Sequence, residues 1–217
     1  MRVCLASTSP ARLMLLRQVG IEPETLAPGV DEEAVVAAVE QAEERTLTPD
    51  EHVLLLARRK AADVAATLRE RDPDFDGIVI GGDSMFAFGG EILGKPHRPE
   101  VAAARWREMR GGTGILHSGH SVFRLQPGRP AVEAHAVAVA SVTFAADVDD
   151  EEIAAYVASG EPLQVAGAFT LDSLAGAFIE RVDGDPSTVV GMSLSTLRHL
   201  VRDLGVSWTA LWQTRSA

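Results

Sequence analysis

Two serines and an arginine stand together where a helix is expected to begin. After an apolar run over residues 2–6, the chain reads Ser7-Thr8-Ser9-Pro10-Ala11-Arg12. Ser9 is a favourable N-cap residue and the proline after it a favourable first helical residue, which predicts a strand, a turn and a helix in succession. The N–H groups of a helix start, together with Ser7, Ser9 and Arg12, can bind an anion. A plain capped helix with an exposed arginine is the alternative.

Only two of the 20 basic residues are lysines, Lys60 and Lys95. A compact ammonium with three donors suits some sites that a planar guanidinium does not. Lys60 is four residues from both Leu56 and Val64, at the flank of the apolar stripe of a helix predicted over residues 49–71. It could therefore reach into a cleft, or its stem could simply cover apolar surface. Codon bias in the genome is the other explanation for so few lysines.

An aspartate falls inside an apolar segment. We predict a short buried strand over residues 77–80, an interruption at Gly81-Gly82-Asp83, and a continuation over residues 85–88. A buried carboxylate is unfavourable unless it meets a cation or a metal, and the two glycines would let backbone or ligand approach closely. An aspartate that merely starts a turn is the alternative.

A second lysine motif follows a predicted hairpin. Gly89-Gly90 predicts the turn, and residues 91–93 the return strand, which ends in Gly94-Lys95-Pro96. We expect the two arms of this hairpin to bring Asp83 and Lys95 towards the same end, although a surface turn would also explain the motif.

These signals together suit the cleavage of a phosphoanhydride. They supply a phosphate cradle, two ammonium groups and a carboxylate. Cations neutralise the charge of a transferring phosphoryl group, and a carboxylate can hold a metal or deprotonate water.

The other periodic segments alternate between strands and helices, which predicts an α/β fold with a mixed, twisted sheet flanked by helices. Acid-rich residues 31–45 predict an irregular or helical surface segment. Further predicted elements are a helix over 100–109, two or three strands within 115–144 with a loop at 126–130, a helix over 149–158 and a last helix over 195–204.

Composition limits the partners. With 217 residues the chain is long enough for one large domain or two tightly joined lobes. Its net charge of −11 argues against duplex nucleic acid, which requires clustered cations. No apolar run approaches the roughly 18 residues that span a bilayer. The single cysteine, Cys4, allows no internal disulfide and fits a reducing cytoplasm.

Ordered motifs through nearly the whole chain resemble those of the Maf family of nucleoside triphosphate pyrophosphatases. They are Ser7-Thr8-Ser9-Pro10-Ala11-Arg12, Asp31-Glu32, Ala57-Arg58-Arg59-Lys60-Ala61, Gly81-Gly82-Asp83-Ser84, Gly94-Lys95-Pro96, Tyr156-Val157-Ala158-Ser159-Gly160-Glu161-Pro162, Ala166-Gly167-Ala168 and Gly184-Asp185-Pro186-Ser187-Thr188-Val189-Val190-Gly191.

The resemblance implies a single Maf/Ham1-like domain over residues 1–217, made of two lobes with an active-site cleft between them. It implies hydrolysis of a nucleoside triphosphate to the monophosphate and pyrophosphate with a divalent metal, Mg²⁺ or Mn²⁺, often in a homodimer. Asp83 would accept a proton or hold the metal with help from Glu32, and Arg12, Lys60 and Lys95 would bind phosphate. Removal of non-standard or surplus nucleotides is the implied role.

The departures from the family pattern concern the base. Ala11 replaces the first arginine of the common turn, Ser84 replaces the usual threonine, and Asp172 replaces the usual glutamine. In the family these positions sort substrates by base, so Ser84 and Asp172 are predicted to face the base, and the preferred base stays open. The triphosphate-handling residues are intact.

Two other functions are compatible with these residues. One is a non-catalytic, nucleotide-binding regulator of cell division, which the altered base-side positions would suit. The other is a general phosphatase of small metabolites. His117 and His120 are three residues apart, but without a third ligand nearby we interpret them as structural.

Overall fold

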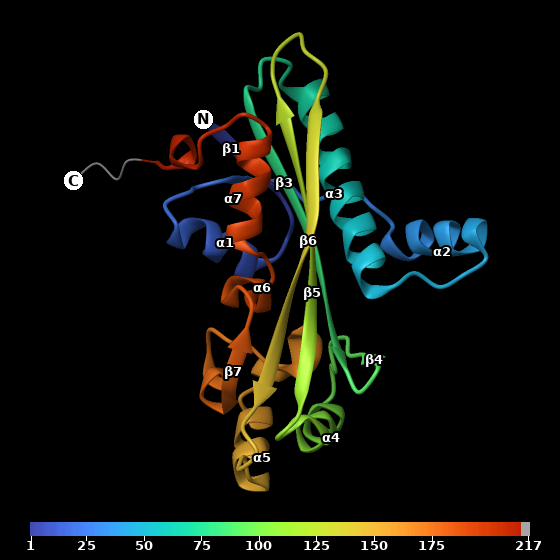
Figure 1. Ribbon diagram of the computed structural model, residues 1–217, viewed down its shortest axis with the longest axis vertical. Helices are drawn as coiled ribbons and strands as arrows, with labels where there is room; N and C mark the ends of the chain where they lie inside the picture. The colour runs from blue at the N-terminus through green and yellow to red at the C-terminus, as the bar shows by residue number, and fades with distance from the viewer. Residues whose placement is uncertain (214–217) are drawn as a thin grey trace. The chain divides into compact units, whose positions relative to one another are not determined.

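A mixed sheet organises the chain (Figure 1). The structure is a computed structural model that describes residues 1–213. Within them the sheet has seven strands in the order β2-β1-β3-β5-β6-β7, and β4 pairs with β3 off this path. The strands are β1 (Arg2–Ala6), β2 (Glu24–Thr25), β3 (Gly77–Phe88), β4 (Glu91–Ile92), β5 (Thr113–Leu125), β6 (Val132–Phe144) and β7 (Ile179–Asp183).

Both strand directions occur, as predicted. β1 runs parallel to β2 and to β3, whereas the pairs β3–β4 and β6–β7 are antiparallel. The helices are α1 (Pro10–Gln18), α2 (Glu32–Glu43), α3 (Pro49–Arg71), α4 (Pro99–Met109), α5 (Asp150–Ala158), α6 (Pro186–Val190) and α7 (Leu194–Asp203). The predicted α/β class with a mixed sheet flanked by helices is therefore confirmed.

The chain divides into two compact units, each built from separate segments. The first unit comprises residues 1–83, 118–138 and the segment from 191 onwards, and the second comprises residues 84–117 and 139–190. The strands β3, β5 and β6 contribute residues to both. The single domain and the cleft predicted from the family resemblance stay predictions.

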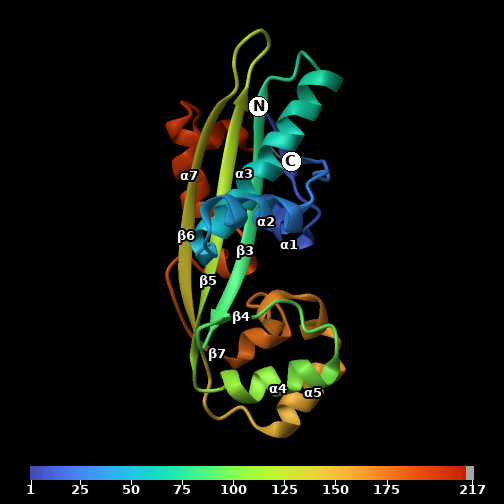
Figure 2. The ribbon, with the colours of Figure 1, turned by 90° about the vertical axis from the view of Figure 1, so that its right-hand side faces the viewer.

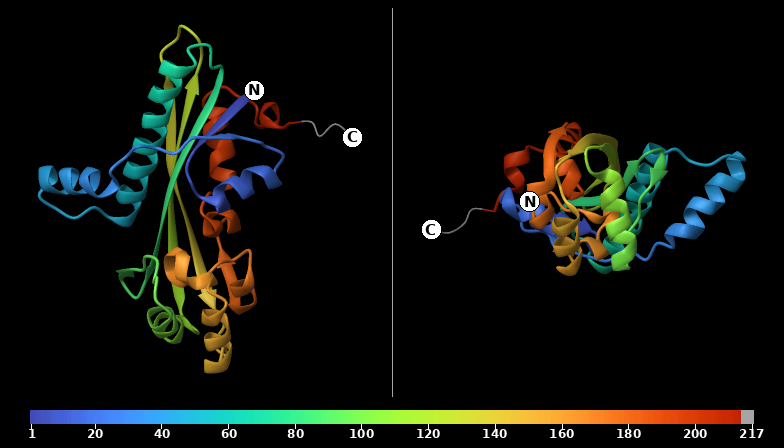
Figure 3. Two further views of the ribbon diagram at one scale, coloured as in Figure 1. Left: turned by 180° about the vertical axis from the view of Figure 1, so that it is seen from behind. Right: turned by 90° about the horizontal axis from the view of Figure 1, so that it is seen from below.

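In the first unit, helices cover both faces of the sheet. α3 lies on one face, and α1 and α7 lie on the other (Figures 1 and 3). α3 begins with a capping box, in which Thr48 and Glu51 each bind the other's backbone N–H group. Its buried face includes Val64 and Leu68, which join a core cluster with Val79 of β3 and Cys4 of β1. Burial raises the pKa of the Cys4 thiol to about 11, which fits an inert core residue.

In the second unit the core is aromatic. Trp106 of α4 is fully buried and packs edge-on against Phe144, Tyr156 and Phe178 at centroid distances of 5.5, 5.3 and 5.7 Å. Its indole N–H donates to the carbonyl of Ala168 at 2.7 Å. α4 and α5 pack side by side around this cluster (Figure 2). Trp106 is therefore the centre of this core.

The prediction that the strand breaks at Gly81-Gly82-Asp83 was wrong. β3 runs without interruption from Gly77 to Phe88. A Cβ added at Gly81 would lie 2.5 Å from the carbonyl oxygen of Ala57 and 2.8 Å from the Cβ of Ala61. Gly81 is needed because α3 packs directly on the strand, and not because the strand ends there.

The remaining differences concern short elements. The glycine hairpin turn is confirmed, with positive φ at Gly89 and Gly90 and with Ala87 paired to Ile92. Sequence patterns did not predict β2, β7 or α6, nor the 3₁₀ turns between residues 161 and 178. No helix within residues 1–213 combines the length and the apolar character needed to cross a membrane.

The close approach at Gly81 can be tested by adding one methyl group. We expect Gly81→Ala to lower the free energy of unfolding by about 1–3 kcal/mol, because the methyl group overlaps the α3 backbone. Urea titration measures this. Gly94→Ala is the matched control, since nothing lies within 4 Å of an added Cβ there. Equal stability of the two variants would contradict the packing argument.

Candidate active site

Lys60 joins two carboxylates in the first unit. Its Nζ lies 2.8 Å from Oδ1 of Asp83 and 2.8 Å from Oε1 of Glu32. The side chains come from three elements: α3, β3 and the first residue of α2. The lysine side chain is 9% exposed, that of Asp83 14% and that of Glu32 50%. An ammonium so deeply buried has to be paired with carboxylates, because an unpaired charge in a buried position is strongly destabilising.

Helical periodicity explains why Lys60 lies on the buried face of α3. Its neighbours there are Ala57 and Ala61, and the same face packs on Gly81 of β3. Because the helix sits so close to the strand, a compact ammonium on a four-carbon stem reaches Asp83 two residues further along β3. Lys60 thus pairs with two carboxylates and does not merely cover apolar surface, while its role towards a ligand stays a prediction.

The predicted anion site at the start of α1 has the expected cap. The Ser9 side chain accepts a hydrogen bond from the Arg12 backbone N–H at 3.4 Å, and Ser7 Oγ accepts one from the Ser9 N–H at 3.1 Å. The Arg12 side chain folds inwards, with Nη1 donating to Ser7 Oγ at 3.4 Å and Nε to the Gly191 carbonyl at 2.9 Å. Arg12 is therefore not the exposed arginine of a plain helix start.

Arg12 belongs to the same electrostatic cluster as Lys60. Burial lowers the pKa of its guanidinium, and the negative charges of Asp83 and Glu32 act in the opposite direction. The cluster contains two basic side chains, Arg12 and Lys60, and two acidic ones, Asp83 and Glu32. Their formal charges therefore sum to zero. A polyanionic ligand entering this cluster would bring excess negative charge, which a further cation would have to neutralise.

The donor set fits a metal that arrives with its ligand. Within residues 1–213 no group of three or more histidine, cysteine or carboxylate side chains is placed to hold a metal. Asp83 and Glu32 are nevertheless hard oxygen donors that meet on one ammonium. Mg²⁺ is commonly bound by one or two carboxylates together with waters and substrate phosphates. The two carboxylates suit that arrangement better than a resident, all-protein metal site.

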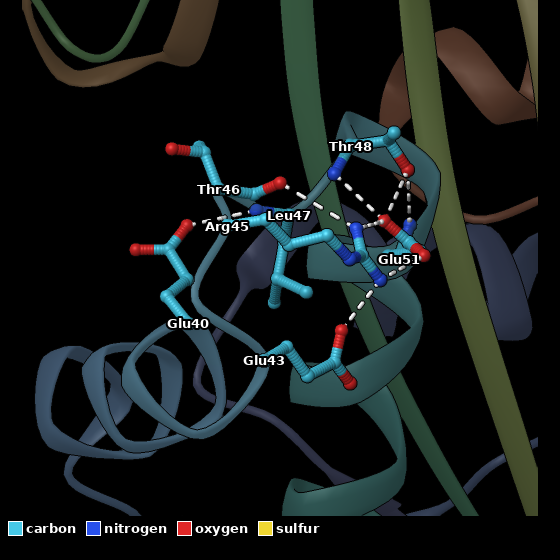
Figure 4. Close-up of polar contacts among 7 residues, drawn as sticks. All are labelled: Glu40, Glu43, Arg45, Thr46, Leu47, Thr48 and Glu51. Atoms are coloured by element: carbon cyan, nitrogen blue, oxygen red, sulfur yellow. Dashed lines mark hydrogen bonds and ion pairs between the residues drawn. The ribbon is translucent and has the colours of Figure 1, made fainter.

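Glu32 depends on α2, a helix with no buried residue. Asp31 caps its start by accepting a hydrogen bond from the Ala34 N–H at 3.0 Å. At its far end, Arg45 binds both oxygens of Glu51 at 2.8 and 2.7 Å and one oxygen of Glu43 at 2.6 Å (Figure 4). The acid-rich segment predicted as irregular or helical is thus a surface helix.

Three further hydrogen bonds complete the polar contacts at the junction of α2 and α3. We call this junction the latch, and its residues are Glu40, Glu43, Arg45, Leu47, Thr48 and Glu51. The Leu47 N–H donates to Glu40 Oε1 at 2.9 Å, and Glu51 accepts from the Thr48 N–H and hydroxyl, each at 2.9 Å (Figure 4). Hydrogen bonds from Arg45 and then from Thr48 lower the pKa of Glu51 to about 2. The latch consequently stays ionised at neutral pH and holds the helix that presents Glu32.

Six of the nine predicted site residues lie in the first unit: Ser7, Ser9, Arg12, Glu32, Lys60 and Asp83. The other three, Ser84, Lys95 and Asp172, belong to the second unit. Lys95 and Asp172 are exposed, and Arg105 donates to the carbonyl of Gly94 beside Lys95. The roles assigned to all nine residues from the sequence stay predictions.

The backbone partner of Arg12 could not be predicted from the sequence. The Gly191 carbonyl accepts from Arg12 and also from the Ser118 hydroxyl at 3.4 Å. Gly191 closes the motif that begins at Gly184, so the motif marked the position without revealing the contact. His120 is fully buried, and its Nε2 accepts from the Ser193 N–H at 2.8 Å, in line with a structural role.

Comparison with known proteins decides the family. The family model described as Maf-like protein matches residues 2–204. This chain belongs to the Maf-like family. A relative from Leifsonia xyli subsp. xyli named nucleoside triphosphate pyrophosphatase is 60% identical over 212 residues, which cover 98% of this chain and 97% of the relative. One of the same name from Nocardia farcinica is 49% identical over 209 residues, 96% of this chain and 95% of its own.

A solved structure of the Staphylococcus aureus Ham1 protein is a more distant neighbour of this Maf-like chain. The likeness covers 67% of this chain and 73% of that one, at 10% identity and a TM-score of 0.31. At that score it does not bear on the fold.

Removing the shared ammonium should cost stability as well as function. We expect Lys60→Met to lower the free energy of unfolding by about 3 kcal/mol, because Asp83 and Glu32 would then face each other without their cation. The double variant Lys60→Met, Asp83→Asn should recover part of that loss. Lys95→Met, at the other lysine of the chain, is the control and should change stability by less than about 0.5 kcal/mol. A Lys60→Met variant as stable as this control would refute the cluster.

The latch can be tested through the dynamics of α2. We expect Arg45→Ala to speed amide hydrogen exchange along residues 32–43 without speeding it in the middle of α3, because α2 has little apolar anchorage of its own. Arg17→Ala removes another exposed arginine–glutamate pair, that with Glu22, and serves as the control. Unchanged exchange in α2 after Arg45→Ala would show that the latch does not hold it.

Proposed function

We propose that this chain hydrolyses a nucleoside triphosphate between its α- and β-phosphates, giving the monophosphate and pyrophosphate. The observation that carries the proposal is the cluster in which Lys60 binds both Asp83 and Glu32 beside the Arg12 cradle. The names of the relatives from Leifsonia xyli and Nocardia farcinica support the substrate and the bond. A chain of this family with its charged site residues intact is expected to be an enzyme.

The start of α1 suits the phosphate chain. Backbone N–H groups at a helix N-terminus and a guanidinium beside them favour bound anions. Arg12 is already held in place by Gly191 and Ser7, so little side-chain ordering is needed on binding. We assign Ser7, Ser9 and Arg12 to the phosphates.

Asp83 is placed to take a proton from the attacking water. Lys60 occupies Oδ1, and within residues 1–213 Oδ2 makes no hydrogen bond. In the proposed step the water oxygen forms a bond to the α-phosphorus, and its proton passes to Oδ2. The bond from that phosphorus to the bridging oxygen breaks, and pyrophosphate leaves with the electron pair. Lys60 keeps Asp83 oriented throughout.

Asp83 and Glu32 would also hold a divalent cation, Mg²⁺ or Mn²⁺, together with the substrate phosphates. When bound, it would neutralise phosphate charge that the balanced protein cluster leaves uncompensated. The cation bound by these carboxylates would thereby complete the charge balance of the substrate complex.

Three further predicted residues are also assigned to the substrate. We assign Lys95 to phosphate, since its exposed ammonium makes no ion pair within residues 1–213. We assign Ser84 and Asp172 to the base. The homodimer, the cytoplasmic location and the removal of non-standard or surplus nucleotides stay predictions.

The function is tested by product analysis. Wild-type protein is incubated with a panel of ribo- and deoxyribonucleoside triphosphates and Mg²⁺ or Mn²⁺, and the products are separated. We expect monophosphate and pyrophosphate. Diphosphate with phosphate would contradict the choice of bond, and binding without cleavage would favour the regulator.

Asp83→Asn tests the proton acceptor. We expect turnover to fall by at least about 100-fold, because an amide cannot take the proton, while the far-ultraviolet circular dichroism spectrum stays that of the wild type. Asp63→Asn is the matched control: Asp63 lies on α3 and accepts a hydrogen bond from the Gly29 N–H at 2.8 Å, outside the cluster. Activity retained in Asp83→Asn would remove Asp83 from this role.

A further inference from the structure

One carboxylate in the second unit collects five hydrogen bonds. Glu161 Oε1 accepts from the Tyr156 and Thr170 hydroxyls at 3.0 and 2.5 Å and from the Ala175 N–H at 3.4 Å. Its Oε2 accepts from the Ser173 hydroxyl at 2.7 Å and from the Leu174 N–H at 3.3 Å. Four of these donors come from a single loop, residues 170–175.

Glu161 is itself firmly anchored. It follows Gly160, whose φ of 79° turns the chain after α5, and its own N–H donates to Ser159 Oγ at 3.2 Å. The Tyr156 ring that binds it packs against Trp106 in the core at a centroid distance of 5.3 Å. The loop is thus tied through one side chain to the rigid part of the second unit.

The loop presents its tip to solvent. Phe169 and Ala175 are buried at its two ends, whereas Asp172, Ser173 and Leu174 are exposed, Leu174 to 57%. Asp172 makes no hydrogen bond or ion pair within residues 1–213. A fixed backbone that exposes one carboxylate and one apolar side chain is suited to recognition, since both can meet a ligand without prior ordering.

The charge of Glu161 is needed for this arrangement. Partial burial raises its pKa, but hydrogen bonds from Thr170, Ser173 and Tyr156 outweigh that effect and lower the pKa below its ordinary value. A lowered pKa in the folded state means that the loop gains stability above the ordinary glutamate pKa and loses it as the pH falls through the lowered value. The loop is therefore fully held at neutral pH.

We propose that Glu161 is a positioning residue that holds the 170–175 loop in the conformation by which the enzyme distinguishes nucleotide bases. The inference rests on the proposed function, which assigns Asp172 to the base. Glu161 acts through the loop and touches no substrate.

Base chemistry selects the nucleotides for the test. A carboxylate only accepts hydrogen bonds. Guanine offers two adjacent N–H groups on its pairing edge, whereas uracil offers one N–H between two carbonyl oxygens that would repel Asp172. GTP and UTP are therefore the pair that a fixed Asp172 separates best.

The experiment compares kcat/KM for GTP and UTP, with Kd measured in parallel by calorimetry, in wild type, Glu161→Gln and Asp172→Ala. We expect wild type to favour GTP and both variants to lose about tenfold of the GTP-to-UTP ratio, because a loosened loop no longer fixes the acceptor. The change should lie mainly in KM for GTP. Amide exchange of Leu174 and Ala175 should also accelerate in Glu161→Gln.

Two further variants separate positioning from general stability. Glu152→Gln alters another carboxylate of the second unit, the capping box of α5, and should leave the ratio unchanged. Thr170→Val with Ser173→Ala removes two donors but keeps Glu161, and should lower the ratio even if Glu161→Gln does not fold.

The outcomes are distinct. An unchanged GTP-to-UTP ratio in Glu161→Gln or, if that variant does not fold, in the double variant, or a wild type that does not separate the two nucleotides, would overturn the inference. Absence of cleavage in wild type would instead overturn the proposed function, and the ratio of Kd values would then decide the role of Glu161.

Discussion

The first unit depends on one ammonium held between two carboxylates. Lys60 is nearly inaccessible to solvent, and its charge is compensated by Asp83 and Glu32 together. Three elements must converge for this to happen. α3 has to lie directly on β3, which requires a glycine at position 81, and α2 has to bring Glu32 over the lysine. The stabilising interaction and the candidate chemistry therefore share the same atoms.

The cluster and the loop of the second unit show two uses of a buried or half-buried carboxylate. Asp83 is bound by a single cation at one oxygen, which leaves the other oxygen for chemistry. Glu161 is saturated by donors at both oxygens, which suits a fixed support and not a reacting group. The number of donors around each carboxylate distinguishes the two roles without reference to any relative.

Much of the fold could be predicted from local patterns. The cap at Ser9, the long helix over residues 49–71 and the Gly89-Gly90 turn follow from short-range physical rules. The continuity of β3 could not be predicted, because a glycine placed for helix packing has the same sequence signature as a glycine that interrupts a strand. Short elements such as β7 carry too few residues for a periodic signal.

The site was predictable to a similar degree. The rarity of lysine indicated Lys60, and the cost of burying a carboxylate indicated Asp83. No local pattern in the sequence indicated Glu32, which was predicted only from the family motif. The contact between Arg12 and Gly191 joins positions 179 residues apart, and Glu161 gathers donors from positions 5 to 14 residues away. Such contacts arise from the tertiary fold and leave no periodic trace in a single sequence.

The central claim is that one lysine is buried between Asp83 and Glu32, and the scarcity of lysine makes it directly measurable. Protein labelled with ¹⁵N only at its two lysines gives at most two side-chain ammonium signals in an NMR spectrum. We expect one ammonium to exchange slowly with water and to shift in both Asp83→Asn and Glu32→Gln, and the other to exchange rapidly. Two rapidly exchanging ammonium groups, or a slow one that neither variant shifts, would contradict the account.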